Sequence, residues 1–147
     1  MIGVFDGEFA WLSNFYESPI ADEEGVVYPT IEHYFQAMKT LDSSERFNIA
    51  IQPTPGKAKR CGRKVSLRPD WEEVKEEIMF IALRKKFSNP ILKAKLLATG
   101  NEYLEEGTTW HDNEWGVCRC EKCQDILGKN KLGKLLMKLR EEIRNGS

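Results

Sequence analysis

The chain has 147 residues, of which 41% are hydrophobic and 31% charged, a length and composition that favour one compact domain with a real core. The formal net charge of −1 excludes the basic surplus that a non-specific nucleic-acid binder usually carries. No apolar run approaches about 18 residues, and "MIGVFDGEF" lacks the basic start of a secretory signal, so we expect neither a membrane span nor export.

The N-terminal third begins with an aromatic-rich segment, "GVFDGEFAWLSNFYESPI". Its composition predicts short strands or extended pieces, with a turn at Ser13-Asn14. The next segment, "GVVYPT", predicts a short strand that stops at Pro29. Thr30 is a good N-cap, so we expect a helix from Ile31 to about Leu41.

Polar cap residues, some followed by proline, predict the remaining helices. The expected helices cover Glu45–Ile51 after Ser43 or Ser44, the segment after Thr54-Pro55, Asp70–Phe87 with Asp70 as N-cap, the segment from Asn89-Pro90 to Gly100, and Lys131–Arg144. Helices with a few short strands indicate a mainly helical α+β fold, and we expect one domain over residues 1–147.

Three polar residues recur on the helix predicted after Thr30. Glu32, Gln36 and Lys39 lie at i, i+4 and i+7, so their directions fall within about 60° of one another. An apolar face lies beside them, and spacing alone favours a water-exposed stripe over a pocket. The alternative is a ligand pocket, in which a carboxylate, an amide and an ammonium bind a polar substrate and perform acid–base or nucleophilic chemistry.

The four cysteines allow two interpretations. Cys118, Cys120 and Cys123 lie close together, and with the distant Cys61 they could form a structural zinc site. We favour free thiols, because the first gap is one residue and the fourth ligand is a guess. Cysteines without a leader favour a reducing, cytoplasmic compartment. With two histidines in the chain, we expect no catalytic metal and no cofactor.

Several motifs together resemble one known family. The segments "FAWLSNFYESPI", "YPTIEHYFQAMK", "LRPDWEEVKEEIMFIALRKKFSNP", "LLATGNEYLEE", "WHDNEWGV" and "GKNKLGKLLMKLREEI" follow the order seen in the NADAR superfamily, also called YbiA-like or riboflavin biosynthesis intermediates N-glycosidase proteins. The resemblance runs from about Phe9 to Arg144. It implies a helical α+β fold and hydrolysis of an N-glycosidic bond. Members of the family cleave phosphoribosyl-pyrimidine intermediates of riboflavin biosynthesis, and others remove ADP-ribose from guanine.

The resemblance also implies which residues carry the chemistry. Glu32 and Lys39 match the family's EH…Q…K segment, Asp112 and Trp115 its D…WG segment, and Asn14 its SNF segment. The cysteine-rich "VCRCEKC" departs from the commoner pattern of relatives, which leaves the rim of the pocket, and hence the substrate, open.

Cleavage of a C1′–N bond builds positive charge on the ribose, and two carboxylates can support that charge and activate water, by analogy with O-glycosidases. We therefore expect Glu32 and Asp112 to converge on the anomeric carbon, in either division of roles. Lys39 would hold a phosphate or attack C1′. Other expected contacts are the stacking aromatics Trp11, Phe15, Tyr16 and Trp115, which by residue type are core residues first, and the polar Asn14, Gln36, Arg63 and His111.

The leading prediction is therefore an N-glycosidase acting on a small ribosylated base or nucleotide, or on ADP-ribosylated guanine within a nucleic acid. One alternative is a non-catalytic domain that binds ADP-ribose or a related nucleotide. Another is a nucleic-acid module, against which the near-zero net charge argues. The sequence does not indicate an oligomeric state.

Overall fold

A computed structural model describes residues 1–146, which fall into two compact units. One unit is Asn14–Ser88; the other joins Met1–Ser13 to the chain from Asn89 onward. Each unit combines helices with a two-stranded sheet, which confirms the predicted mainly helical α+β class. The single domain expected over residues 1–147 stays a prediction.

The Asn14–Ser88 unit begins with an antiparallel hairpin of β1 (Ile20–Ala21) and β2 (Val27–Tyr28). The second strand stops before Pro29, as predicted. Helix α1 (Ile31–Ala37) follows, and the Thr30 hydroxyl accepts a hydrogen bond from the backbone N–H of His33, which confirms the predicted N-cap. The helix is shorter than predicted: Met38 is its C-cap, and the next residue, Lys39, donates its N–H to the Gln36 carbonyl in a tighter turn.

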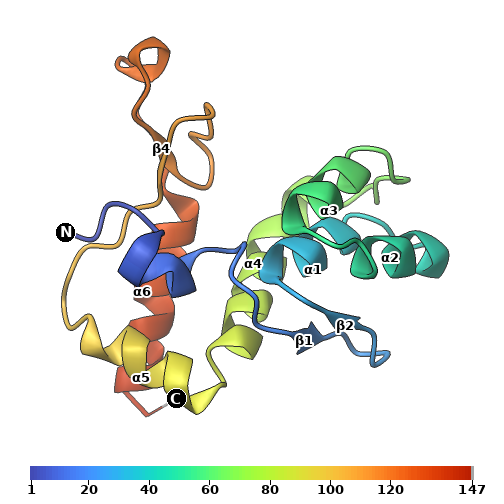
Figure 1. Ribbon diagram of the computed structural model, residues 1–147, viewed down its shortest axis with the longest axis horizontal. Coiled ribbons are helices and arrows are strands. Elements are labelled where there is room, and N and C mark those ends of the chain that lie inside the picture. The colour runs from blue at the N-terminus through green and yellow to red at the C-terminus, as the bar shows by residue number, and fades with distance from the viewer. Residues whose placement is uncertain (147) are drawn as a thin grey trace. The chain divides into compact units, whose positions relative to one another are not determined.

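Three further helices surround α1 in this unit, and Figure 1 shows α2 and α3 gathered against it. The predicted cap before Pro55 is confirmed, but the start of α2 differs: the carboxylate of Asp42 accepts from Glu45 N–H and begins the helix two residues early. Asp70 makes no side-chain cap, because Arg68 holds its carboxylate at 2.7 Å. These helices are α2 (Ser43–Ala50), α3 (Pro55–Gly62) and α4 (Trp71–Lys86).

The first element of the other unit differs from the prediction. Gly7–Leu12 forms a 3-10 helix, η1, where short strands were expected. Local hydrogen bonds explain the difference: Phe9 N–H donates to the Asp6 carbonyl, and Ser13 N–H donates to the Ala10 carbonyl. These tight turns direct the large apolar side chains Trp11 and Leu12 inward, which satisfies burial without a strand.

The same unit contains two predicted helices and a small sheet, labelled in Figure 1 where there is room. Asn89 caps α5 by accepting from two backbone N–H groups, and Gly100 follows the helix with a φ of +62°. Both features, and the bounds of the last helix, confirm the sequence analysis. The elements are α5 (Pro90–Ala98), α6 (Lys131–Arg144) and the parallel strands β3 (Gly107–Thr108) and β4 (Val117–Cys118); a second 3-10 turn, η2, covers Glu121–Cys123.

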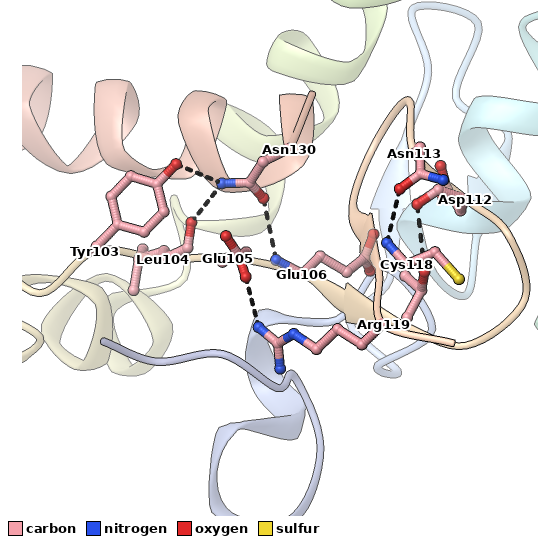
Figure 2. A network of polar contacts seen from close by, with 10 residues as sticks. Tyr103, Leu104, Glu105, Glu106, Asp112, Asn113, Cys118, Arg119 and Asn130 are labelled. Carbon is pink, nitrogen blue, oxygen red and sulfur yellow. Dashed lines mark hydrogen bonds and ion pairs between the residues drawn. The ribbon is translucent and has the colours of Figure 1, made fainter. Parts of the chain in front are cut away.

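Asn130, at the start of α6, connects this helix to the segment leading into β3 (Figure 2). Its side-chain NH₂ donates to the Leu104 carbonyl at 2.9 Å, and its side-chain oxygen, Oδ1, accepts from Glu106 N–H at 3.1 Å. The close approach also requires Gly133, where an added Cβ would lie 2.1 Å from the Leu104 carbonyl oxygen. These contacts position β3 and the loop that follows it. None of the described helices is long and apolar enough to cross a membrane.

Lys86, at the end of α4, has a buried side chain. It is 1% exposed, with Nζ 5.6 Å from the Tyr16 ring and 5.3 Å from the Phe87 ring. Burial lowers the pKa of Lys86 to about 7, because the charged form loses solvation.

This burial predicts a pH dependence of stability. An unfolded lysine has a pKa of about 10.4, so between about pH 7 and pH 10 the unfolded chain binds more protons and the stability rises with pH. Lys86→Met should flatten this rise in urea unfolding followed from pH 7 to pH 9. Lys93→Met, on an exposed face of α5, should leave it intact. An unchanged slope in Lys86→Met would contradict the assignment.

Candidate functional site

The polar row of α1 is buried, not water-exposed. Every residue from Ile31 to Met38 is buried, with Glu32 8% exposed and Gln36 4% exposed. The interpretation that spacing alone favoured, a water-exposed stripe, is therefore wrong. The physical reason is that α2, α3 and α4 all pack on α1, so no face of this short helix remains open. A carboxylate held away from bulk water interacts more strongly with any charge that develops beside it.

Glu32 and Gln36 form a hydrogen-bonded pair one helical turn apart. Gln36 Nε2 donates to Glu32 Oε1 at 2.9 Å, which orients the carboxylate. Among the described residues, no group donates to the buried Gln36 Oε1 or to the buried Asn14 Oδ1. An unsatisfied buried acceptor costs about 1–3 kcal/mol, so both amides have unused capacity for a donor such as a sugar hydroxyl.

Asn14 is joined to the same helix through its backbone. Its carbonyl accepts from Glu32 N–H at 3.1 Å, and its side-chain NH₂ lies 3.7 Å from Met79 Sδ. The turn expected at Asn14 is present. The contact brings the "SNF" and "EHYFQ" segments together, as the pocket interpretation requires.

Lys39 lies just beyond the end of α1 in a half-buried position. Burial is the main cause that lowers the pKa of its ammonium, and the Glu32 carboxylate opposes that shift. Arg63, Lys59 and Lys75 are near enough to lower the pKa further. Lys39 and the cations near it together have the charge to hold an anionic phosphate.

The sequence analysis missed Gly62, a position that the Gln36 side chain depends on. A Cβ added at Gly62 would lie 1.9 Å from Gln36 Oε1, so only glycine lets the carboxamide lie against α3. No local signal marks this glycine, since it has an ordinary helical conformation and its requirement arises from a neighbouring helix.

The loop between β3 and β4 carries the second predicted carboxylate. Asp112 Oδ1 accepts from the backbone N–H groups of Glu114 and Trp115, at 3.1 and 2.9 Å, and so fixes the turn before Gly116. Figure 2 shows Asp112 and Asn113 beside Cys118. Asp112 and Trp115 are both half-buried.

A lysine of α6 supports the same loop. Lys131 Nζ donates to Glu114 and lies 5.9 Å from the Trp115 ring centroid. The hydrogen bond from Lys131, helped by Lys129, holds the pKa of Glu114 well below its usual range. Glu114 is thus ionised at neutral pH and acts as an anchor for the two lysines.

The predicted site residues divide between the two units. Asn14, Glu32, Gln36, Lys39 and Arg63 are brought together in one unit by the contacts above, whereas Trp11, His111, Asp112 and Trp115 belong to the other. His111 Nδ1 lies 3.3 Å from Cys123 Sγ, among the cysteines.

The aromatic candidates differ in accessibility. Trp11 is buried at 6% exposure, as expected of a core residue. Phe15, whose type favoured the core, is 47% exposed, and Tyr16 is 37% exposed. An exposed ring following Asn14 has area to stack on a planar base, so Phe15 and Tyr16 are better platforms than Trp11.

Comparison with known proteins identifies the family. A family model described as the NADAR domain matches residues 4–144. The chain belongs to this family, as the sequence motifs predicted.

Similar proteins carry names that describe an activity. The Escherichia coli protein "N-glycosidase YbiA" is 45% identical over 139 residues, covering 92% of this chain and 82% of that protein. The NMR structure of E. coli YbiA matches with a TM-score of 0.81 and 40% identity, over 99% of this chain and 88% of that one. A riboflavin biosynthesis protein of Vibrio vulnificus is 34% identical over 94% of this chain, which spans 36% of that longer protein. These relatives support an N-glycosidase function and confirm the predicted enzyme class.

Substitution of Gly62 tests the packing of the polar pair. Gly62→Ala should displace the Gln36 carboxamide and lower the free energy of unfolding by about 1–3 kcal/mol, the usual cost of overpacking. Gly56→Ala is a matched control on the same helix, because its Cβ would meet nothing closer than 4.0 Å. Urea unfolding measures both.

A double variant separates this clash from a general helix effect. Combining Gln36→Ala with Gly62→Ala should give a smaller loss than the sum of the two single changes, since the displaced group is gone. Additive losses, or a Gly62→Ala variant as stable as the Gly56→Ala control, would contradict the assignment.

Proposed function

We propose that this NADAR-family chain hydrolyses the bond between ribosyl C1′ and the nitrogen of a heterocyclic base, with Glu32 as a catalytic carboxylate. The observation that carries the proposal is a buried carboxylate, oriented by an amide and close enough to Lys39 to influence its pKa, in a chain similar to named N-glycosidases. A small phosphoribosyl-pyrimidine is the favoured substrate, because one similar protein is named for riboflavin biosynthesis. ADP-ribosylated guanine, free or within a nucleic acid, is the second candidate.

Glu32 suits the electrostatic demand of this reaction. The transition state places positive charge on the ribose ring, and a buried carboxylate stabilises that charge without reorganising solvent. Gln36 keeps the carboxylate in one orientation through its 2.9 Å hydrogen bond. Glu32 would then support the developing cation or position the attacking water.

The neighbouring groups match the remainder of such a substrate. The acceptors Gln36 Oε1 and Asn14 Oδ1 could receive hydrogen bonds from ribose hydroxyls. Lys39, with Arg63 close enough to influence its pKa, would bind the phosphate. In this role Lys39 stays protonated; attack on C1′ by its deprotonated amine is the alternative role.

The role expected of Asp112, which is to contact ribose hydroxyls or remove a proton from water, stays a prediction for the other unit. Its loop position is fixed by two backbone hydrogen bonds, so the charge is presented in one orientation. Phe15, with its exposed ring, is proposed to stack on the leaving base; the stacking role expected of Trp115, in the other unit, stays a prediction.

The cysteines bear on the compartment, and the amides and cations bear on the alternative function. All four cysteines are free, which agrees with a reducing cytoplasm. A non-catalytic nucleotide-binding domain remains the second candidate function, since the same amides and cations would bind a ligand without turnover.

The central test is a substrate panel with a charge-neutral change at Glu32. We expect base release, followed by chromatography, from riboflavin-pathway phosphoribosyl-pyrimidines, and compare ADP-ribosylated guanine in DNA and NAD. Glu32→Gln should lower turnover by about 10²–10⁴-fold, the usual contribution of a positioned acid or base. Glu77→Gln, an exposed glutamate of α4, is the control and should retain activity.

The outcomes distinguish the two candidate functions. Saturable binding with no base release from any panel member would favour the binding domain. Turnover by Glu32→Gln close to that of the unaltered chain would remove Glu32 from the mechanism.

Two substitutions at Asp112 distinguish the effect of its negative charge on turnover from its role in holding the turn before Gly116. Asp112→Asn keeps an Oδ1 that can accept from Glu114 and Trp115, so its thermal midpoint should stay close to normal while turnover falls at least tenfold. Asp112→Ala should lose both, because the two N–H groups lose their acceptor. Normal turnover in Asp112→Asn would restrict Asp112 to a structural role.

A further inference from the structure

Four potential metal ligands meet beside the β4 strand. His111 Nδ1 and the Sγ atoms of Cys118, Cys120 and Cys123 all lie within 4.8 Å of one another. Cys118 ends β4, Cys120 precedes η2 and Cys123 ends it, while His111 comes from the loop before β4. Thus the fourth member of the group is His111, whereas the sequence analysis chose Cys61, a residue of α3 in the other unit.

The separations match the edges of a tetrahedron around a metal. Zinc bonds to sulfur at about 2.3 Å and to nitrogen at about 2.0–2.1 Å, so tetrahedral ligands stand about 3.8 Å apart for two sulfurs and about 3.5 Å for sulfur and nitrogen. Here Cys118 Sγ lies 3.3 Å from Cys120 Sγ, and His111 Nδ1 lies 3.4 Å from Cys120 Sγ, 3.3 Å from Cys123 Sγ and 3.9 Å from Cys118 Sγ.

Alternative explanations fit this group less well. A disulfide needs sulfurs about 2.05 Å apart, and all four cysteines are free. Burial of an apolar thiol explains one inward cysteine, but not three thiols directed at one imidazole nitrogen. His111 also adopts a φ of 67°, a left-handed conformation that non-glycine residues rarely take and that turns this side chain toward the sulfurs.

We propose that His111, Cys118, Cys120 and Cys123 bind one zinc ion. Three thiolates and one imidazole are a ligand set that zinc prefers. Four protein ligands fill the tetrahedron and leave no position for substrate or water, so the ion is structural and takes no part in hydrolysis.

The site would fix the loop that carries Asp112. His111 immediately precedes Asp112, and Asn113 Oδ1 accepts from Cys118 N–H at 2.9 Å. The ion would thus join the two ends of the segment from His111 to Cys118, in addition to the short parallel strand pair and the hydrogen bonds that already hold this segment. Metal binding by such a set contributes directly to local folding.

Metal content tests the proposal independently of any activity. The full chain, without an affinity tag and purified without added zinc or chelator, should contain about one zinc per chain by elemental mass spectrometry. Cys118→Ser and Cys123→Ser should each lower the content at least fivefold. Cys61→Ser is the matched control, because this thiol lies outside the group, and it should keep the full content.

Cobalt substitution tests the ligand set and does not depend on how well the cysteine variants fold. Cobalt(II) added to metal-free protein should give the intense visible bands of a tetrahedral site with thiolate charge transfer in the ultraviolet. His111→Cys should retain a tetrahedral spectrum with stronger charge transfer, and His111→Ala should weaken zinc binding at least tenfold in a chelator competition. Less than a tenth of an equivalent of zinc, or an octahedral cobalt spectrum, would overturn the proposal, as would loss of metal in Cys61→Ser.

Discussion

The burial of the hydrogen-bonded Glu32–Gln36 pair inside a helical cluster is the constraint on which the candidate chemistry depends. A buried carboxylate is unfavourable unless its oxygens are partnered, and here an amide one turn along the helix supplies a partner. The cost of this arrangement is offset by packing of α1 against three helices. The buried carboxylate is also preorganised, and its surroundings of low dielectric constant would strengthen its attraction for a developing positive charge.

The position of the Gln36 side chain also depends on Gly62, a neighbouring residue that has no side chain. Gly62 leaves space for the Gln36 carboxamide, and an added Cβ would lie 1.9 Å from its Oε1, so the amide would have to move. The acceptor of the same amide stays unsatisfied among the described residues, which is unusual in a well-packed interior. An unsatisfied acceptor beside an oriented carboxylate agrees with the hydroxyl-bearing ligand proposed for this chain.

The sequence was most informative where a local rule decides the structure. Thr30 and Asn89 begin helices through side-chain oxygens that accept from nearby backbone N–H groups, and these caps need no tertiary context. Prediction failed where packing between distant segments decides. Helical spacing could not distinguish a water-exposed stripe from a buried one at Glu32, since burial depends on three other helices. The burial of Lys86 could not be predicted either, because it too depends on the segments that pack around the helix.

The cysteine group is a second case in which spacing along the chain could not predict which residues lie together. Spacing along the chain indicated the three cysteines of the proposed site but could not indicate His111, because the loop that carries His111 turns back through a left-handed residue. His111 Nδ1 lies among the sulfurs, and an imidazole that binds the proposed zinc ion is not available as an acid or base on substrate. The proposed metal site and the proposed hydrolysis therefore bear on each other: if His111 binds a structural ion, the proposed acid and base roles fall to carboxylates such as Glu32 and Asp112.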